Sequence, residues 1–191
     1  ARIELLEKVA ALLGSAMTES KAATQHLIEQ NPALEMLFNA GVVVNDINGD
    51  VIADLPVPSR RIGLNLLNLD HVAGAMREGK SLVSPPVPGI TQKRPVLGIA
   101  VPIRDAQGQI IGALSGVTNL GISNFLDAVA EKRYGKTGGY LIVAAQHRLI
   151  VTATEKSRVL EQLPARGVNS RIDQLIDGHE GSSLLLDPRG V

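Results

Sequence analysis

Two stretches of the chain, at residues 41–54 and 139–153, share the pattern of a β-hairpin, and this repeat limits the possible folds more than any other feature. In the first, GVVVNDINGDVIAD, β-branched runs flank Asn48-Gly49, a dipeptide typical of tight hairpin turns. In the second, GYLIVAAQHRLIVTA, the apolar residues fall at the same places when Gly41 is aligned with Gly139. The repeat predicts two modules built from one supersecondary unit.

The first module continues with signals for one helix and three further strands. Gly79 ends the helix, and Pro85-Pro86 stops the strand that follows it. Two long apolar strands are then joined by the turn sequence DAQG. The predicted ranges are 69–78 for the helix and 81–84, 96–104 and 109–117 for the strands. With the hairpin, these segments predict an α+β fold in which a five-stranded antiparallel sheet carries helices on one face.

The second module starts in the same way and then diverges. It has helical candidates at residues 155–163 and 170–177 and a strand candidate at 182–186. By analogy with the first module, its last two strands are expected to be missing from this sequence, which would leave the module truncated. The predicted boundaries are an N-terminal helix at 1–36, the first module at 37–121, a connecting helix and joint at 122–137, and the second module at 138–191.

A long helix is predicted before the first module, because residues 3–29 contain no proline and Gly14 is their only glycine. Apolar and small residues recur there at steps of three and four: Ile3, Leu6, Ala10, Leu13, Met17, Ser20, Thr24 and Leu27. This seam either packs on its own domain or pairs with a second copy in a homodimer. Asn31-Pro32 ends or interrupts the helix.

Composition excludes several classes of function. Only 2% of the residues are aromatic and the 19 basic residues equal the 19 acidic ones in number, so neither base-stacking platforms nor a global field favour nucleic acid. There is no cysteine, and the four histidines lack metal-ligand spacing, so no metal or cofactor is expected. No nucleophile elbow, phosphate loop or paired carboxylate motif is complete, and an enzyme is therefore the least favoured class.

The order of these segments resembles the double Cache sensor domains of bacteria, whose modules are PAS-like. The resemblance covers essentially the whole chain. Its most specific parts are the first hairpin, the strand VSPP and the hairpin PIRDAQGQIIGALSG. It implies a periplasmic domain held between two transmembrane helices that lie outside this sequence, with a membrane-distal first module that senses a small molecule and a membrane-proximal second module. The implied output is a diguanylate cyclase, a histidine kinase or a chemoreceptor signalling module.

The resemblance also indicates where a ligand would bind. In this family the distal pocket is walled by the segment between the second and third strands, the loop before the fourth strand and the inner faces of the last two strands. These places hold Arg60, Arg61, Asp70, His71, Ser84, Lys93, Arg94, Thr118 and Asn119. Cations from two segments would suit a carboxylate or a phosphate; the alternative is that they are solvated loop charges. His71 would add a pH-sensitive contact, or it is an ordinary residue at a helix start.

Two departures from the family narrow the class of ligand. Amino-acid-binding members place an Asp near the end of the last strand to meet the ligand ammonium, whereas this chain has Thr118 and Asn119 there. They also carry an aromatic-rich helix, and the matching NLDHVAGAM has no aromatic residue. The favoured function is therefore an extracytoplasmic input domain that binds a small anion such as an organic carboxylate. The rival is a dimerisation or protein-interaction module with no metabolite ligand.

Overall fold

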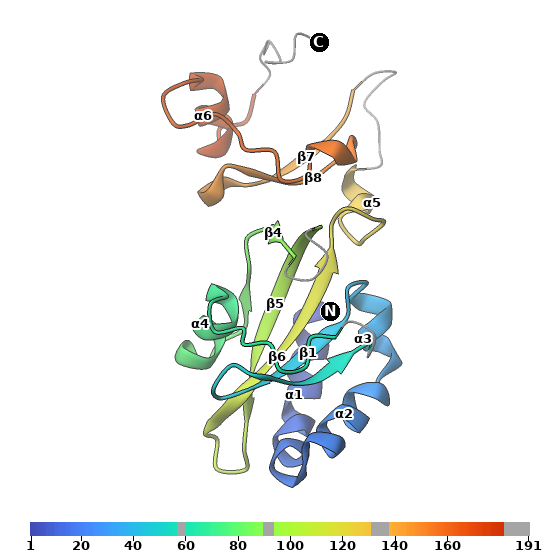
Figure 1. Ribbon diagram of the computed structural model, residues 1–191. Coiled ribbons are helices and arrows are strands. Elements are labelled where there is room, and N and C mark those ends of the chain that lie inside the picture. The colour runs from blue at the N-terminus through green and yellow to red at the C-terminus, as the bar shows by residue number, and fades with distance from the viewer. Residues whose placement is uncertain (57–59, 90–93, 131–137, 182–191) are drawn as a thin grey trace. The chain divides into compact units, whose positions relative to one another are not determined.

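The computed structural model describes residues 1–56, 60–89, 94–130 and 138–181. It divides into two compact units, residues 1–124 and 125–191 (Figure 1). Among the described residues, no helix combines the length and the hydropathy that a bilayer crossing requires.

An antiparallel sheet forms the centre of the first unit. Its strands are β1 (Val42–Asp46), β2 (Val51–Leu55), β3 (Leu82–Val83), β4 (Val87–Pro88), β5 (Pro95–Arg104) and β6 (Ile110–Asn119). Five of them follow the order β2-β1-β6-β5-β3, and β4 also pairs with β5. The α+β class and the five-stranded path are as predicted, and β4 is a short addition. Gly49, in the β1–β2 turn, has a φ of +84°, which explains the glycine at that position.

Helices cover both faces of this sheet, so the prediction of helices on one face is wrong (Figure 1). Neighbouring residues of β6 show this. A Cβ on Gly112 would lie 2.9 Å from the Met17 side chain, whereas Ala113 belongs to a core cluster with Val72 and Met76 of α4 (Asp70–Glu78). Successive strand residues point to opposite faces, so α1 and α4 must lie on opposite sides. The αL residue Gly79 ends α4, as predicted.

The N-terminal helix is broken, contrary to the prediction of one helix to residue 29. The chain forms α1 (Arg2–Glu19), α2 (Lys21–Glu29) and α3 (Pro32–Leu37). At Ser20 the backbone is extended, and the Ser20 hydroxyl accepts a hydrogen bond from the N–H of Ala23. This side chain caps α2 and so competes with continuation of α1.

The predicted seam of α1 packs on the chain's own sheet. Leu6, Ala10 and Leu13 are buried there, and α1 contacts β5 and β6. Gly14 lets the helix approach closely, because a Cβ at that position would lie 2.0 Å from the carbonyl oxygen of Arg104. The seam is therefore used within the domain, and a homodimer through the other faces of the N-terminal helix stays a prediction.

The second unit contains the repeated hairpin. Its elements are α5 (Asp127–Ala130), β7 (Leu141–Ala144), β8 (Leu149–Ala153), the 3-10 turns Ala145–His147 and Lys156–Arg158, and α6 (Ser170–Ile176). The hairpin and α6 are as predicted, and residues 182–186 lie outside the described residues. The predicted helix at 155–163 is wrong, because the backbone there bonds to β8: Leu160 N–H donates to Ile150 O (2.9 Å), and Ile150 N–H donates to Glu161 O (3.1 Å).

The two hairpins match beyond their strands. In the first unit, residues 63–64 border β2 with the same pair of bonds: Gly63 N–H donates to Val51 O and Val51 N–H donates to Leu64 O, both at 2.9 Å. A short segment thus lines the outer edge of the second strand in both units. This shared detail supports the internal repeat that the sequence predicts.

Candidate functional site

A cavity of about 200 Å³ lies in the first unit, on the face of the sheet that carries α4. Its walls come from the sheet, the start of α4, the segment after β2 and the β4 region. The lining residues are Asn39, Ala40, Val43, Pro56, Arg61, Leu64, Leu66, Leu69, His71, Ser84, Val87, Pro88, Gly89, Arg94, Val96, Gly98, Val117 and Asn119. Five of the nine residues predicted to bind a ligand are among them: Arg61, His71, Ser84, Arg94 and Asn119.

The register of the sheet decides which strand residues reach this cavity. Val96 pairs with Asn119, and Gly98 pairs with Val117, so these four share one face. Thr118 lies between Val117 and Asn119 and points to the opposite face, where its hydroxyl is buried without a hydrogen-bond partner. The structure therefore brings Asn119 to the cavity and keeps Thr118 away from it.

His71 and Ser84 meet at Gly98 of β5. Ser84 is held by two 2.8 Å hydrogen bonds, because its N–H donates to the Gly98 carbonyl and its Oγ accepts from the Gly98 N–H. A Cβ at Gly98 would lie 2.4 Å from Nε2 of His71, so the missing side chain makes room for the imidazole. Burial lowers the pKa of His71, and the nearby Asp70 carboxylate partly opposes that shift.

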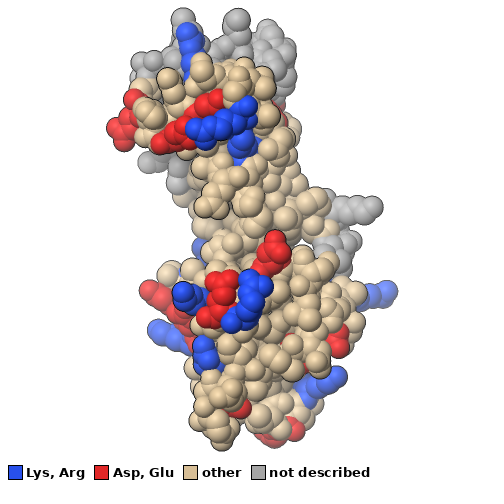
Figure 2. All heavy atoms as spheres, turned by 90° about the vertical axis from the view of Figure 1, so that its left-hand side faces the viewer, with Lys and Arg blue, Asp and Glu red and all other residues tan. Residues whose placement is uncertain are grey.

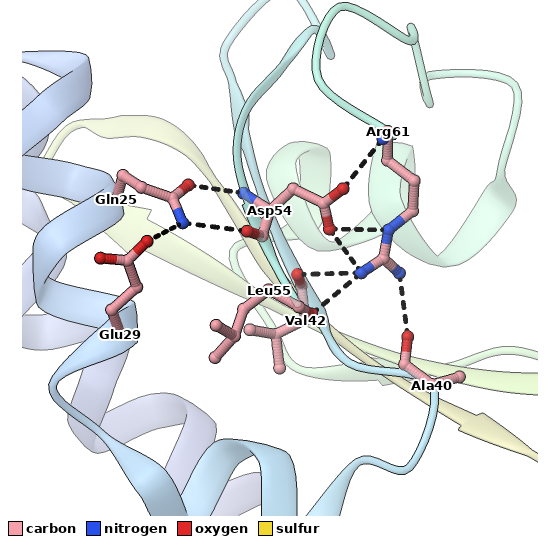
Figure 3. A network of polar contacts seen from close by, with 7 residues as sticks. All are labelled: Gln25, Glu29, Ala40, Val42, Asp54, Leu55 and Arg61. Carbon is pink, nitrogen blue, oxygen red and sulfur yellow. Dashed lines mark hydrogen bonds and ion pairs between the residues drawn. The ribbon is translucent and has the colours of Figure 1, made fainter. Parts of the chain in front are cut away.

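Arg61 lines the cavity but is engaged by the protein, as Figure 3 shows. Its Nε and Nη2 donate to Oδ1 of Asp54 at 2.8 and 2.5 Å, and its backbone N–H donates to Oδ2 at 2.9 Å. Its guanidinium also reaches the carbonyl oxygens of Ala40 (3.1 Å), Leu55 (3.0 Å) and Val42 (3.3 Å). All three guanidinium nitrogens thus hold the cavity wall to β1, to β2 or to Ala40 ahead of β1.

Of the other charged residues predicted at the site, one lines the cavity and two are exposed without lining it. Arg94 is exposed and lines the cavity, and its carbonyl accepts a 2.7 Å hydrogen bond from the N–H of Gly89. Arg60 and Asp70 are exposed and do not line the cavity. Lys93 lies outside the described residues. Arg94 thus differs from Arg61. It lines the cavity, and its guanidinium donates no hydrogen bond to any of the described residues.

The charge around the cavity is one-sided. The lining holds two arginines and a histidine and includes no Asp or Glu among the described residues, and because Asp54 balances the charge of Arg61, the net positive charge comes from Arg94. Residues 57–59 and 90–93, which are next to the lining in sequence, contain no acidic residue either. On the face drawn in Figure 2, by contrast, acidic and basic side chains are interspersed. The positive preference is local to the cavity, in keeping with the neutral formal charge of the chain.

Sequence reasoning missed several lining residues. Asn39 and Gly89 come from short connecting segments and Val87 from the two-residue strand β4, whose placement depends on the whole module. Gly98 had a usable signal, because a glycine inside a strand often marks close approach of another group. The alternation of side chains along a strand also gave a usable signal. Adjacent strand residues such as Thr118 and Asn119 point to opposite faces, so they cannot both line one cavity.

No protein-family model and no curated protein matches this chain. Solved structures do match it. The ligand-binding domain of the Pseudomonas aeruginosa PAO1 amino acid chemoreceptor PctC, in complex with GABA, is 20% identical with a TM-score of 0.69, over 85% of this chain and 70% of that one. The corresponding domain of Pseudomonas fluorescens CtaA with L-serine is 23% identical (TM-score 0.65, 85% and 66%). That of Mlp24 with asparagine is 16% identical (TM-score 0.66, 85% and 65%).

This chain spans about two thirds of the length of these domains. The chain has the double Cache, PAS-like fold of the ligand-binding domains of bacterial chemoreceptors.

Proposed function

We propose that this chain is the ligand-sensing input domain of a bacterial transmembrane signalling protein and that its first unit binds a small organic carboxylate. The observation that carries the proposal is the cavity lining, which offers Arg94 and His71 and no carboxylate among the described residues. A ligand anion gains a charge-assisted hydrogen bond from a guanidinium, and such bonds are about twice as strong as neutral ones.

The ligands of the structural neighbours point to the same chemical group. PctC was solved with GABA, CtaA with L-serine and Mlp24 with asparagine. All three molecules carry a carboxylate and an amine. In this chain the cavity keeps cations for the carboxylate, while Asn119 stands where the resemblance expects an Asp for the ammonium. An ammonium in this cavity would be desolvated without an anionic partner, which disfavours amino acids.

The size of the cavity limits the ligand further. Its volume of about 200 Å³ is below the roughly 300–1,000 Å³ of sites for drug-sized molecules. Arg94 lies at the exposed rim, and Val43, Val96 and Val117 supply apolar walls. A short aliphatic acid such as propionate or butyrate combines the two features, because its carboxylate meets the cations and its chain meets the valines.

The signalling context follows from the fold of the neighbours, which belong to chemoreceptors. We infer an extracytoplasmic, periplasmic position and a cytoplasmic output of the chemoreceptor, cyclase or kinase type. Binding would shift the first unit between two conformations, by as much as the ligand prefers one of them. The α1 seam is used within the domain, so a receptor homodimer through the N-terminal helix would use its exposed face, which includes Leu12.

Butyrate and GABA are the most informative pair of test ligands. GABA is butyrate with one added amine, so the pair isolates the effect of the amine on binding. We expect butyrate to raise the melting temperature of the protein and GABA to raise it less. At a hundred times its dissociation constant, a ligand adds about 2.7 kcal/mol to the stability. Propionate, succinate, L-serine and inorganic phosphate complete the panel.

Arg94→Gln tests the rim cation, and Arg60→Gln is its matched control. Both changes remove one exposed arginine charge, but only Arg94 lines the cavity. Loss of one charge-assisted bond predicts a ten-fold or greater loss of butyrate affinity for Arg94→Gln and little change for Arg60→Gln. If no member of the panel stabilises the protein, the proposed function is wrong and the interaction-module alternative replaces it.

A further inference from the structure

The imidazole of His71 is largely buried beside the cavity. The residue is 8% exposed and lines the cavity. Within the described part of the chain, neither ring nitrogen makes a hydrogen bond. Because the residue lines the cavity, the bonding capacity of this ring is available to a molecule that enters it.

The surrounding backbone fixes where the ring lies. His71 sits in the first turn of α4, a nine-residue helix, and its Nε2 approaches β5 at Gly98. Ser84 Oγ accepts the Gly98 N–H, which fixes the Ser84 side chain beside β5. The first turn of a helix is the positive end of its dipole, which favours an anion close to this side chain.

His71 is also the only group of the described lining that can change its charge near neutral pH. On its own helix, Asp70 is exposed to solvent. From the segment after β2, Arg61 faces the cavity with Asp54 bound to it, and Arg94 reaches it from the start of β5. The neighbouring strand residues Val43, Gly98 and Val117 do not titrate. Arginine stays protonated throughout, so proton uptake by the cavity would belong to His71.

Building on the proposed function, we infer that His71 takes up a proton when a carboxylate enters the cavity and then donates a hydrogen bond from its imidazolium to the ligand. The proton comes from solvent, no covalent bond changes, and the charge of the ligand is balanced by the new charge on the ring. The fraction of sensor with bound ligand therefore depends on both the carboxylate concentration and the pH.

The direction of the effect follows from linkage. In the empty cavity, burial lowers the pKa of His71 below its usual value, so the ring is neutral at neutral pH. A carboxylate beside the ring favours the charged form and raises the pKa again. Between the two pKa values, binding consumes a proton, and affinity rises as the pH falls. The limit is one proton per ligand, or about a ten-fold change in affinity per pH unit.

Isothermal titration of the whole chain with butyrate tests this inference. We would measure the affinity between about pH 6 and 8, the range in which histidine titrates, in two amine buffers of different ionisation enthalpy. The difference in heat between the buffers counts the protons taken up. We expect an uptake approaching one proton and an affinity that rises toward low pH. His71→Gln should lose both effects, whereas His147→Gln, an exposed histidine of the second unit, should keep them.

A second measurement serves in case His71→Gln does not fold. The His71 imidazole resonances of the unchanged protein, followed by NMR against pH, should titrate at a higher pH with butyrate than without it. Butyrate binding with no proton uptake and no shift of this titration overturns the role of His71 and leaves the proposed function standing. Absence of butyrate and propionate binding at every pH overturns both.

Discussion

Replacing Arg61 by alanine should lower the free energy of unfolding of the first unit by about 3–5 kcal/mol, because a buried ion pair would lose one partner. The side chain of Asp54 is fully buried at 0% exposure, and that of Arg61 is 12% exposed. The substitution removes both guanidinium bonds to the Asp54 carboxylate and leaves only the bond from the backbone of residue 61. The carbonyls of Ala40, Val42 and Leu55 lose a donor as well.

Native-state hydrogen exchange, read by mass spectrometry on peptides of β5 and β6, would measure this loss for the first unit separately. Exchange through global unfolding should become at least a hundred-fold faster, since every 1.4 kcal/mol corresponds to ten-fold. Arg60→Ala is the control, because Arg60 is exposed and a surface change typically stays within about 0.5 kcal/mol.

Asp54→Asn separates the charge from the packing, since an amide oxygen can still accept the bond from the backbone of Arg61. We expect it to be destabilising as well, because the buried guanidinium would lose its counter-charge. If Arg61→Ala unfolds like the unchanged protein but no longer binds butyrate, the network is not structural, and Arg61 is a ligand-reading residue after all.

Three further outcomes follow from the cavity. Gly98→Ala should weaken butyrate binding ten-fold or more in calorimetry, because its Cβ would lie 2.4 Å from Nε2 of His71 and force the ring toward the cavity; the double change with His71→Ala should recover part of the loss. Asn119→Asp should raise the affinity for GABA relative to butyrate, since a carboxylate could meet the amine, and an unchanged ratio would contradict the proposed place of the ammonium. The empty protein should lose stability in urea as the pH falls below about 6.5, the usual His value, because the lowered pKa of His71 means that the unfolded chain binds more protons. His71→Gln should flatten that dependence, and equal slopes in the two proteins would refute this assignment.

Much of the fold could be predicted from local patterns. The turn at Gly49, the cap at Gly79 and the paired long strands are each specified by residues close together in the chain. The internal repeat was visible for the same reason. The helix break at Ser20 carried a weaker signal, because a serine in a helical pattern is compatible with a surface position and with a cap.

The candidate site was only partly predictable. The sequence located the segments that supply its walls, and Arg94, His71, Ser84 and Asn119 line the cavity. It could not distinguish Arg61 from Arg60, although they are adjacent and chemically identical. The difference is that the residue 61 side chain meets a buried carboxylate, which is a matter of three-dimensional placement.

The sequence by itself determined the class of the fold, the two related modules and the excess of cations over acids in the segments that line the cavity. Periodicity, turn residues and composition are local properties, and each can be counted along the chain. Only the tertiary structure decided that Arg61 holds the wall, that Thr118 faces away and that His71 lies unpaired over Gly98. The physical reason is that pairing and burial depend on neighbours far apart in sequence, which are brought together when the sheet forms.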